Sequence, residues 1–74
     1  MAKDNLIPGV NVREATHVKV GGRTEKIVSK WGIKPEGGYA KPSEGGFGVV
    51  TESGRRVDMW QAQRYLKEKD PPRT

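Results

Sequence analysis

The strongest structural signals in this chain lie in residues 47–69, FGVVTESGRRVDMWQAQRYLKEK. The first half of this stretch predicts a β-hairpin, because the Ser-Gly pair at 53–54 lies between two runs of strand-forming residues and Gly accepts the positive φ of a tight turn. A two-residue turn there would set Val50 opposite Val57 on an apolar face. A longer loop would shift these pairs.

The second half of the stretch predicts an α-helix. Asp58 is a good helix N-cap, and Gln61, three residues later, completes a capping box. Pro71-Pro72 would stop the helix. The apolar residues that follow the cap at helical spacing are Met59, Ala62 and Leu66, with Tyr65 beside them. We therefore predict that a C-terminal helix folds back over the hairpin.

The earlier part of the chain predicts further strands. Apolar residues of one parity between Val10 and Val20 indicate strand segments, and Gly21-Gly22 then signals a turn. Residues 23–34 fit either a returning strand or a helix that Thr24 caps and Gly32 ends. Their β-branched content and the preceding Gly pair favour the strand.

These signals together predict an α+β fold, in which a small antiparallel β-sheet of three to four strands, arranged as hairpins, carries one C-terminal α-helix. Residues 1–9 are predicted to form a flexible N-terminal tail, residues 10–70 a single small domain, and residues 71–74 a C-terminal tail. Within the domain, residues 34–46 contain four Gly and two Pro, so they are predicted to form a mobile loop.

One resemblance to a known family rests on residues 47–69. A strand-turn-strand unit with Arg55-Arg56 at its tip, followed by a helix, resembles the wing of small winged-helix excisionases. Residues 34–46 stand where the recognition helix of that family would fall, and they are too rich in Gly and Pro for a helix. The same pattern of strands also permits a small SH3-like barrel.

Composition limits the kind of protein. A chain of 74 residues with 32% hydrophobic residues allows one domain with a thin core. The absence of Cys excludes a disulfide framework and thiolate metal sites, and it fits a cytoplasmic location. No apolar run approaches the roughly 20 residues of a membrane span. We therefore expect a soluble, cytoplasmic protein.

Few residues suit catalysis. His17 is the one histidine of the chain, and a lone histidine in a strand-like setting is usually structural. The serines consequently have no evident base partner. A chain of this size also has little room for a cleft that excludes water. We predict that the protein is not an enzyme, and we expect no metal site and no cofactor.

The basic residues suggest two kinds of partner. The net charge is +5, from 14 basic and 9 acidic residues, which favours an anionic partner. Docking on a protein with an acidic patch would use apolar anchors flanked by charges, namely Leu6, Ile7, Lys26, Lys30, Arg55 and Arg56. Direct nucleic-acid binding would use Lys19, Arg23, Lys26, Lys30, Lys34, Arg55, Arg56 and Arg64. On a strand, Lys26, Lys30 and Lys34 would share one face.

The two tryptophans allow two interpretations. Trp31 and Trp60 are large apolar residues in a small chain, so they are predicted to belong to the core. If they were exposed, they would be platforms for base stacking or anchors for a protein partner.

Two functional hypotheses follow from these features. The first is a small regulatory binding protein that docks on a larger nucleic-acid-processing machine, for example RNA polymerase, and modulates it through protein–protein contacts. The alternative is direct, mainly electrostatic binding of DNA or RNA. A purely structural role is the third possibility.

Overall fold

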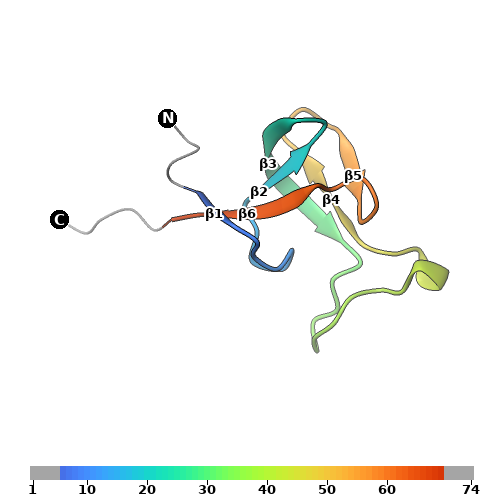
Figure 1. Cartoon of the computed structure of the whole chain (residues 1–74). Helices are drawn as coiled ribbons and strands as arrows, with labels where there is room; N and C mark the ends of the chain where they lie inside the picture. Colours follow the sequence, from blue (N-terminus) through green and yellow to red (C-terminus); the bar gives the residue numbers. More distant parts are fainter. Residues whose placement is uncertain (1–5, 70–74) are drawn as a thin grey trace.

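The computed structural model describes residues 6–69, which form a six-stranded antiparallel sheet (Figure 1). The elements are β1 (Leu6–Pro8), β2 (His17–Val20), β3 (Arg23–Trp31), the short 3-10 turn η2 (Pro42–Glu44), β4 (Gly48–Thr51), β5 (Arg56–Asp58) and β6 (Arg64–Glu68). The strands lie in the order β1-β6-β2-β3-β4-β5. The described residues contain no α-helix, so the prediction of an α+β fold with three to four strands is wrong.

The predicted C-terminal helix is replaced by strand β6. Asp58 does cap a turn, since its carboxylate accepts a hydrogen bond from the N–H of Gln61 at 2.9 Å. The turn ends at once, because the N–H of Gln63 donates to the carbonyl of Lys19 at 2.7 Å and β6 then pairs with the open edge of β2. This pairing satisfies backbone groups of both strands, and it overrides the helical spacing of the sequence.

The first hairpin, formed by β2 and β3, agrees with the sequence. Gly21 and Gly22 have φ values of +58° and +76° and make a two-residue turn between the strands. Two consecutive positive φ values give the turn the twist that suits a tight hairpin. The strand interpretation of residues 23–34 is confirmed for the length of β3.

The second hairpin, formed by β4 and β5, exists in a different register from the predicted one. Val57 lies opposite Val49 instead of Val50. The loop is longer than two residues: residues 52–54 form it, and Gly54 with φ +88° supplies the left-handed position at its end. Because side chains alternate along a strand, this one-residue shift brings Val49 and Val57 together on the buried face.

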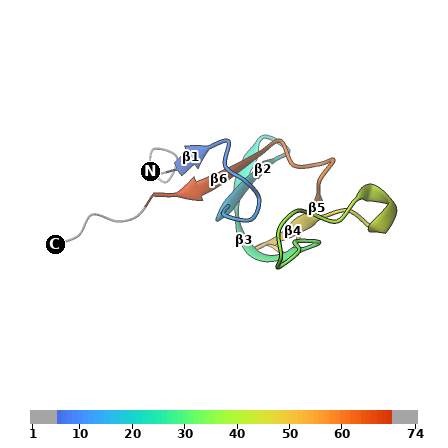
Figure 2. The same ribbon diagram turned by 90° about the horizontal axis from the view of Figure 1, so that it is seen from below.

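The long strand β3 curves and carries an irregularity at Val28. Ile27 lies opposite Thr51, whereas Ser29 lies opposite Val50, so two steps along β3 match one step along β4. Such an extra residue is a β-bulge, and it bends the strand and reverses the alternation of side chains beyond it. The curved strand joins the β1-β6-β2 half of the sheet to the β4-β5 half (Figure 2).

The bulge separates lysines that the sequence places together. Lys26 lies before it and is exposed, whereas Lys30 lies after it, opposite the buried Val49. Lys34 is beyond the end of β3 and forms an ion pair with Glu44 at 3.7 Å. The prediction that these three lysines share one face is therefore wrong.

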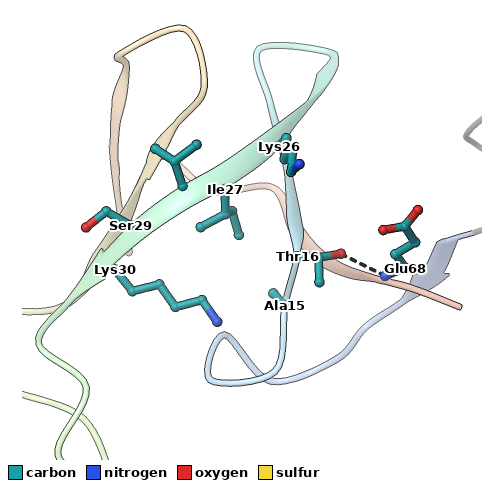
Figure 3. A pocket seen from close by; sticks show the side chains of 8 residues that line it. Ala15, Thr16, Lys26, Ile27, Ser29, Lys30 and Glu68 are labelled. Carbon is teal, nitrogen blue, oxygen red and sulfur yellow. Dashed lines mark hydrogen bonds between the residues drawn. The ribbon is translucent and has the colours of Figure 1, made fainter. Parts of the chain in front are cut away.

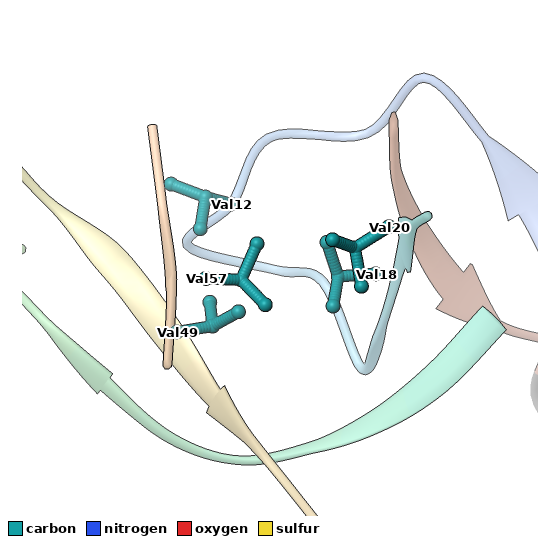
Figure 4. Packing of buried hydrophobic residues seen from close by; sticks show 5 residues of the cluster. All are labelled: Val12, Val18, Val20, Val49 and Val57. Carbon is teal, nitrogen blue, oxygen red and sulfur yellow. The ribbon is translucent and has the colours of Figure 1, made fainter. Parts of the chain in front are cut away.

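The core lies inside the bend of the sheet. Its buried members point toward one another from both halves of the sheet and from the segment before β2 (Figure 4): Val12, Val18, Val20, Val49 and Val57. On β2, the shared parity of Val18 and Val20 is an inward-facing pattern. Val12 is also buried, but it lies in a turn, so the strand predicted for residues before His17 does not extend to it. Tyr65 and Phe47 are among the partly buried side chains that pack against this cluster.

The two ends of the domain meet in the sheet. Leu6–Pro8, which fall within the predicted N-terminal tail, form β1 and pair with β6, and the side chain of Leu6 is buried. Residues 1–5 and 70–74, which include the predicted C-terminal tail, lie outside the described residues.

The Gly/Pro loop at 34–46 is fastened to the segment before β2. The guanidinium of Arg13 donates to the carbonyls of Lys34 and Gly38 at 2.9 and 3.1 Å. The same guanidinium lies over the ring of Tyr39, 5.7 Å from its centroid. These contacts hold one part of the loop against the domain, and the mobility of the loop stays a prediction.

Val57→Ala is expected to lower the free energy of unfolding by about 2 kcal/mol, because it removes two methyl groups from a core side chain with no exposed surface. Val28→Ala is the matched control: its side chain is 60% exposed, and we expect a change below about 0.5 kcal/mol. Urea unfolding followed by tryptophan fluorescence measures both values. Equal losses for the two variants would contradict the core described above.

Candidate anion-binding face

The outer face of the β1-β6-β2-β3 half, which points away from the valine core, carries the best candidate site. Val18 points inward, so its neighbour Lys19 points outward. The register places Lys19 directly opposite Arg64 on β6 and opposite Thr24 on β3. Residues in direct register have Cβ atoms about 5 Å apart. Two cations from different strands are therefore neighbours on this face.

A second row of outward side chains lies two residues away along β2. His17 stands opposite Lys26 on β3 and opposite Leu66 on β6, and Pro8 of β1 stands on the other side of Leu66. Thr16 fixes one nitrogen of the histidine, with 2.8 Å between its hydroxyl and Nδ1. The row thus runs from an apolar side on β1 and β6 to a cationic side on β3.

An open, shallow hollow of about 1230 Å³ lies over these two rows. We call its four cations the basic face: Lys19, Lys26 and Arg64, which point outward, and Arg23, which lies at the end of β3 opposite the inward-facing Val20. Its apolar side consists of Leu6, Pro8 and Leu66, and one carboxylate, that of Glu52, lines it. All four cations belong to the set predicted for nucleic-acid binding.

Few acidic side chains neutralise the cations of the basic face. Among residues 6–69, acidic side chains form ion pairs with Arg23 but not with Lys19, Lys26 or Arg64. Arg23 itself contacts Glu25 at 3.3 Å, although its side chain is 69% exposed. Like charges directly opposite each other destabilise a sheet. An anion bound over the face would relieve this repulsion.

Lys30, which belongs to both predicted sets, lies elsewhere. Its ammonium donates to the carbonyl of Arg13 at 2.8 Å. Burial lowers the pKa of Lys30, and the nearby charge of Arg13 lowers it further. Lys30 lines a smaller hollow of about 380 Å³ at the bend of β3. Its side chain reaches toward the segment before β2, and Lys26 lies apart from Lys30 (Figure 3). Lys30 thus has a structural contact of its own.

The arginines at the tip of the second hairpin are also engaged. The guanidinium of Arg55 lies 3.8 Å from the carboxylate of Glu25, which accepts a hydrogen bond from the hydroxyl of Ser53 at 2.7 Å. Hydrogen bonding from Thr51 and from Ser53 lowers the pKa of Glu25. Arg56 lies over the ring of Trp31, 4.7 Å from its centroid. The two arginines therefore make different contacts within the domain.

The residues predicted for protein docking are dispersed. Leu6 is buried, whereas its neighbour Ile7 is 42% exposed on the opposite face, in register with Lys67. Lys26 belongs to the basic face, and Lys30 faces the segment before β2. The structure therefore brings together four residues of the nucleic-acid set but does not gather the docking set into one surface.

The two tryptophans have positions that differ from expectation, and His17 lies near the basic face. Trp60 is 75% exposed and Trp31 lies outside the buried cluster, so the prediction that both belong to the core is wrong. His17 lines the same hollow as the basic face, and its alternation with the inward Val18 is the signal that could have placed it there.

Comparison with protein-family models, with curated proteins and with solved structures gave no match. Over residues 6–69, no helix is long and apolar enough to cross a membrane. In the same part of the chain, no three His, Asp or Glu side chains lie together in a way that could hold a metal ion. The site is therefore interpreted from the chemistry of its own residues.

Arg64→Glu is expected to raise the free energy of unfolding by about 0.2–1 kcal/mol at low salt, because it turns the like-charge pair with Lys19 into an opposite-charge pair. Arg64→Gln, which only removes the repulsion, should give a smaller gain. Both gains should shrink at about 1 M salt, where charges are screened within a few ångströms. A loss of stability at both salt concentrations would show that Lys19 and Arg64 do not repel each other.

The lowered pKa of Glu25 predicts a loss of stability in acid. A carboxyl whose pKa is lower in the folded than in the unfolded chain stabilises the fold above its ordinary pKa of 4.5, and this stabilisation disappears as the pH falls through the folded value. Glu25→Gln should remove this part of the acid sensitivity in urea-unfolding midpoints measured below about pH 5. Glu36→Gln, in the exposed loop, is the control. An unchanged pH profile in Glu25→Gln would contradict the interpretation.

Proposed function

We propose that this protein binds nucleic acid through the basic face, mainly by electrostatic contacts with phosphate groups. The observation that carries this proposal is the direct opposition of Lys19 and Arg64 across two strands, with Lys26 in the adjacent row. Among the described residues, Lys19, Lys26 and Arg64 form no ion pair with a carboxylate, and a sheet that keeps such like charges together is well suited to an anionic ligand.

The spacing of the charges suits a chain of phosphates better than a single anion. The Cβ atoms of directly opposite residues such as Lys19 and Arg64 are about 5 Å apart, and successive outward rows are about 7 Å apart along the strands. The basic face therefore offers positive charge along two directions of an open hollow. Lysines act as point charges without fixed geometry, so contacts of this kind tolerate any base sequence.

Docking on a protein with an acidic patch, such as a component of RNA polymerase, is the second candidate. The observation in its favour is the apolar side formed by Pro8 and Leu66 next to the cations. Against it, Leu6 is buried and Lys30 and Arg55 are occupied by contacts within the domain. With either partner we place the protein in the cytoplasm, on the basis of its cysteine-free composition.

The double variant Lys19→Ala/Arg64→Ala is expected to weaken binding to a labelled DNA duplex and to flatten its salt dependence. Loss of two phosphate contacts should reduce the slope of log K against log salt by about 1.8. Fluorescence anisotropy over a series of salt concentrations measures both quantities. The matched control is Lys41→Ala, which removes an exposed cation next to η2, far from the basic face (Figure 1).

An unchanged slope in the double variant would show that the basic face does not contact phosphates. Absence of binding to DNA and RNA even at low salt would mean that the positive charge serves a protein partner, which would favour the second candidate.

A further inference from the structure

The outer face of the sheet carries a second surface, beyond the bulge of β3. Trp31 ends β3 and stands opposite Gly48 of β4, which in turn stands opposite Asp58 of β5. Because the bulge at Val28 reverses the alternation, Trp31 lies on the same outer side of β3 as Lys26. Without the extra residue, the indole would be on the side of the valine core.

Gly48 gives the indole of Trp31 its position. A Cβ atom at residue 48 would collide with the ring of Trp31 and with the carbonyl of Val57. The ring therefore lies directly against the backbone of β4, where only glycine leaves room. Arg56, from β5, holds its guanidinium over the same ring at 4.7 Å from the centroid. Trp31 and Arg56 thus form a fixed cation–π stack on the surface.

Trp60 lies in the turn after β5, which begins at Asp58, the residue opposite Gly48. Its side chain is 75% exposed, yet its backbone N–H is held by the carboxylate of Asp58 at 2.9 Å. A large aromatic ring that projects into water from a fixed turn is suited to contact with a partner. We call Trp31, Arg56 and Trp60 the indole surface.

We propose that the indole surface stacks unpaired nucleobases, so that the ligand of this protein is single-stranded nucleic acid rather than duplex. The inference rests on the proposed function, because it assigns the phosphates of the same strand to the basic face. Aromatic rings and guanidinium planes are the groups on which single-stranded bases stack, whatever their sequence. In a duplex, the base faces are already stacked on one another and cannot reach the indoles.

Both surfaces include a residue on the outer side of β3. Lys26 and Trp31 are five residues apart on the outer side of β3, which corresponds to about 16 Å of extended strand. The basic face holds cations without aromatic rings, and the indole surface holds aromatic rings with one stacked arginine. A single strand that crosses both would place its phosphates on the first and its bases on the second.

The test compares three probes of about 12 nucleotides at one salt concentration: a single strand, the corresponding duplex, and an abasic strand that keeps the phosphates and lacks the bases. The single strand should bind the full chain about tenfold more tightly than the other two and should quench tryptophan fluorescence. Trp60→Ala should weaken binding of the single strand about tenfold and leave duplex binding unchanged. Trp60→Phe should keep part of the effect, and Ile7→Ala, at another exposed apolar residue, should have none.

The outcomes separate this inference from the proposed function. Equal affinity for the three probes, unaffected by Trp60→Ala but weakened by Lys19→Ala/Arg64→Ala, would overturn the indole surface and leave the basic face in place. An effect of Trp60→Ala on single strand and duplex alike would also overturn it. Absence of salt-dependent binding to any probe would overturn the proposed function itself.

Discussion

The pairing of β6 with β2 is the constraint on which the rest of the structure depends. It begins with the 2.7 Å hydrogen bond from the N–H of Gln63 to the carbonyl of Lys19 and continues with Tyr65 opposite Val18. On the inner side, the pairing brings Tyr65 against the valine cluster. On the outer side, it sets Arg64 beside Lys19. One backbone pairing thus completes the core and assembles the basic face.

The bulge in β3 is the second determinant, because it decides which side chains reach which face. Lys26 lies before it and Trp31 after it, and both lie on the outer side. Lys30, on the inner side, donates to the carbonyl of Arg13, and Arg13 in turn holds the Gly/Pro loop. A regular strand would have placed Lys30 outside and the indole inside. The surface chemistry of this small domain therefore depends on one extra residue.

Part of this structure could be predicted from the sequence. The Gly21-Gly22 turn and the shared parity of Val18 and Val20 are local signals, and the structure agrees with both. The prediction of a helix after Asp58 is wrong, because pairing with the free edge of β2, which is distant in sequence, outweighs the local helical spacing of the apolar residues. The bulge at Val28 and the three-residue loop depend on the fit between neighbouring strands, which no single stretch of sequence encodes. The same holds for the candidate site. Its basic residues could be named from the sequence, but which of them lie next to one another depends on the register of the strands.

The most direct test of the account is a nuclear Overhauser spectrum of the protein in solution. The account predicts cross-strand contacts between protons of Lys19 and Arg64 and between those of His17 and Leu66, together with slow amide exchange in β6. A series of strong contacts between successive amide protons over residues 59–69, without cross-strand contacts to β2, would indicate a helix. That result would contradict the fold, and with it the basic face.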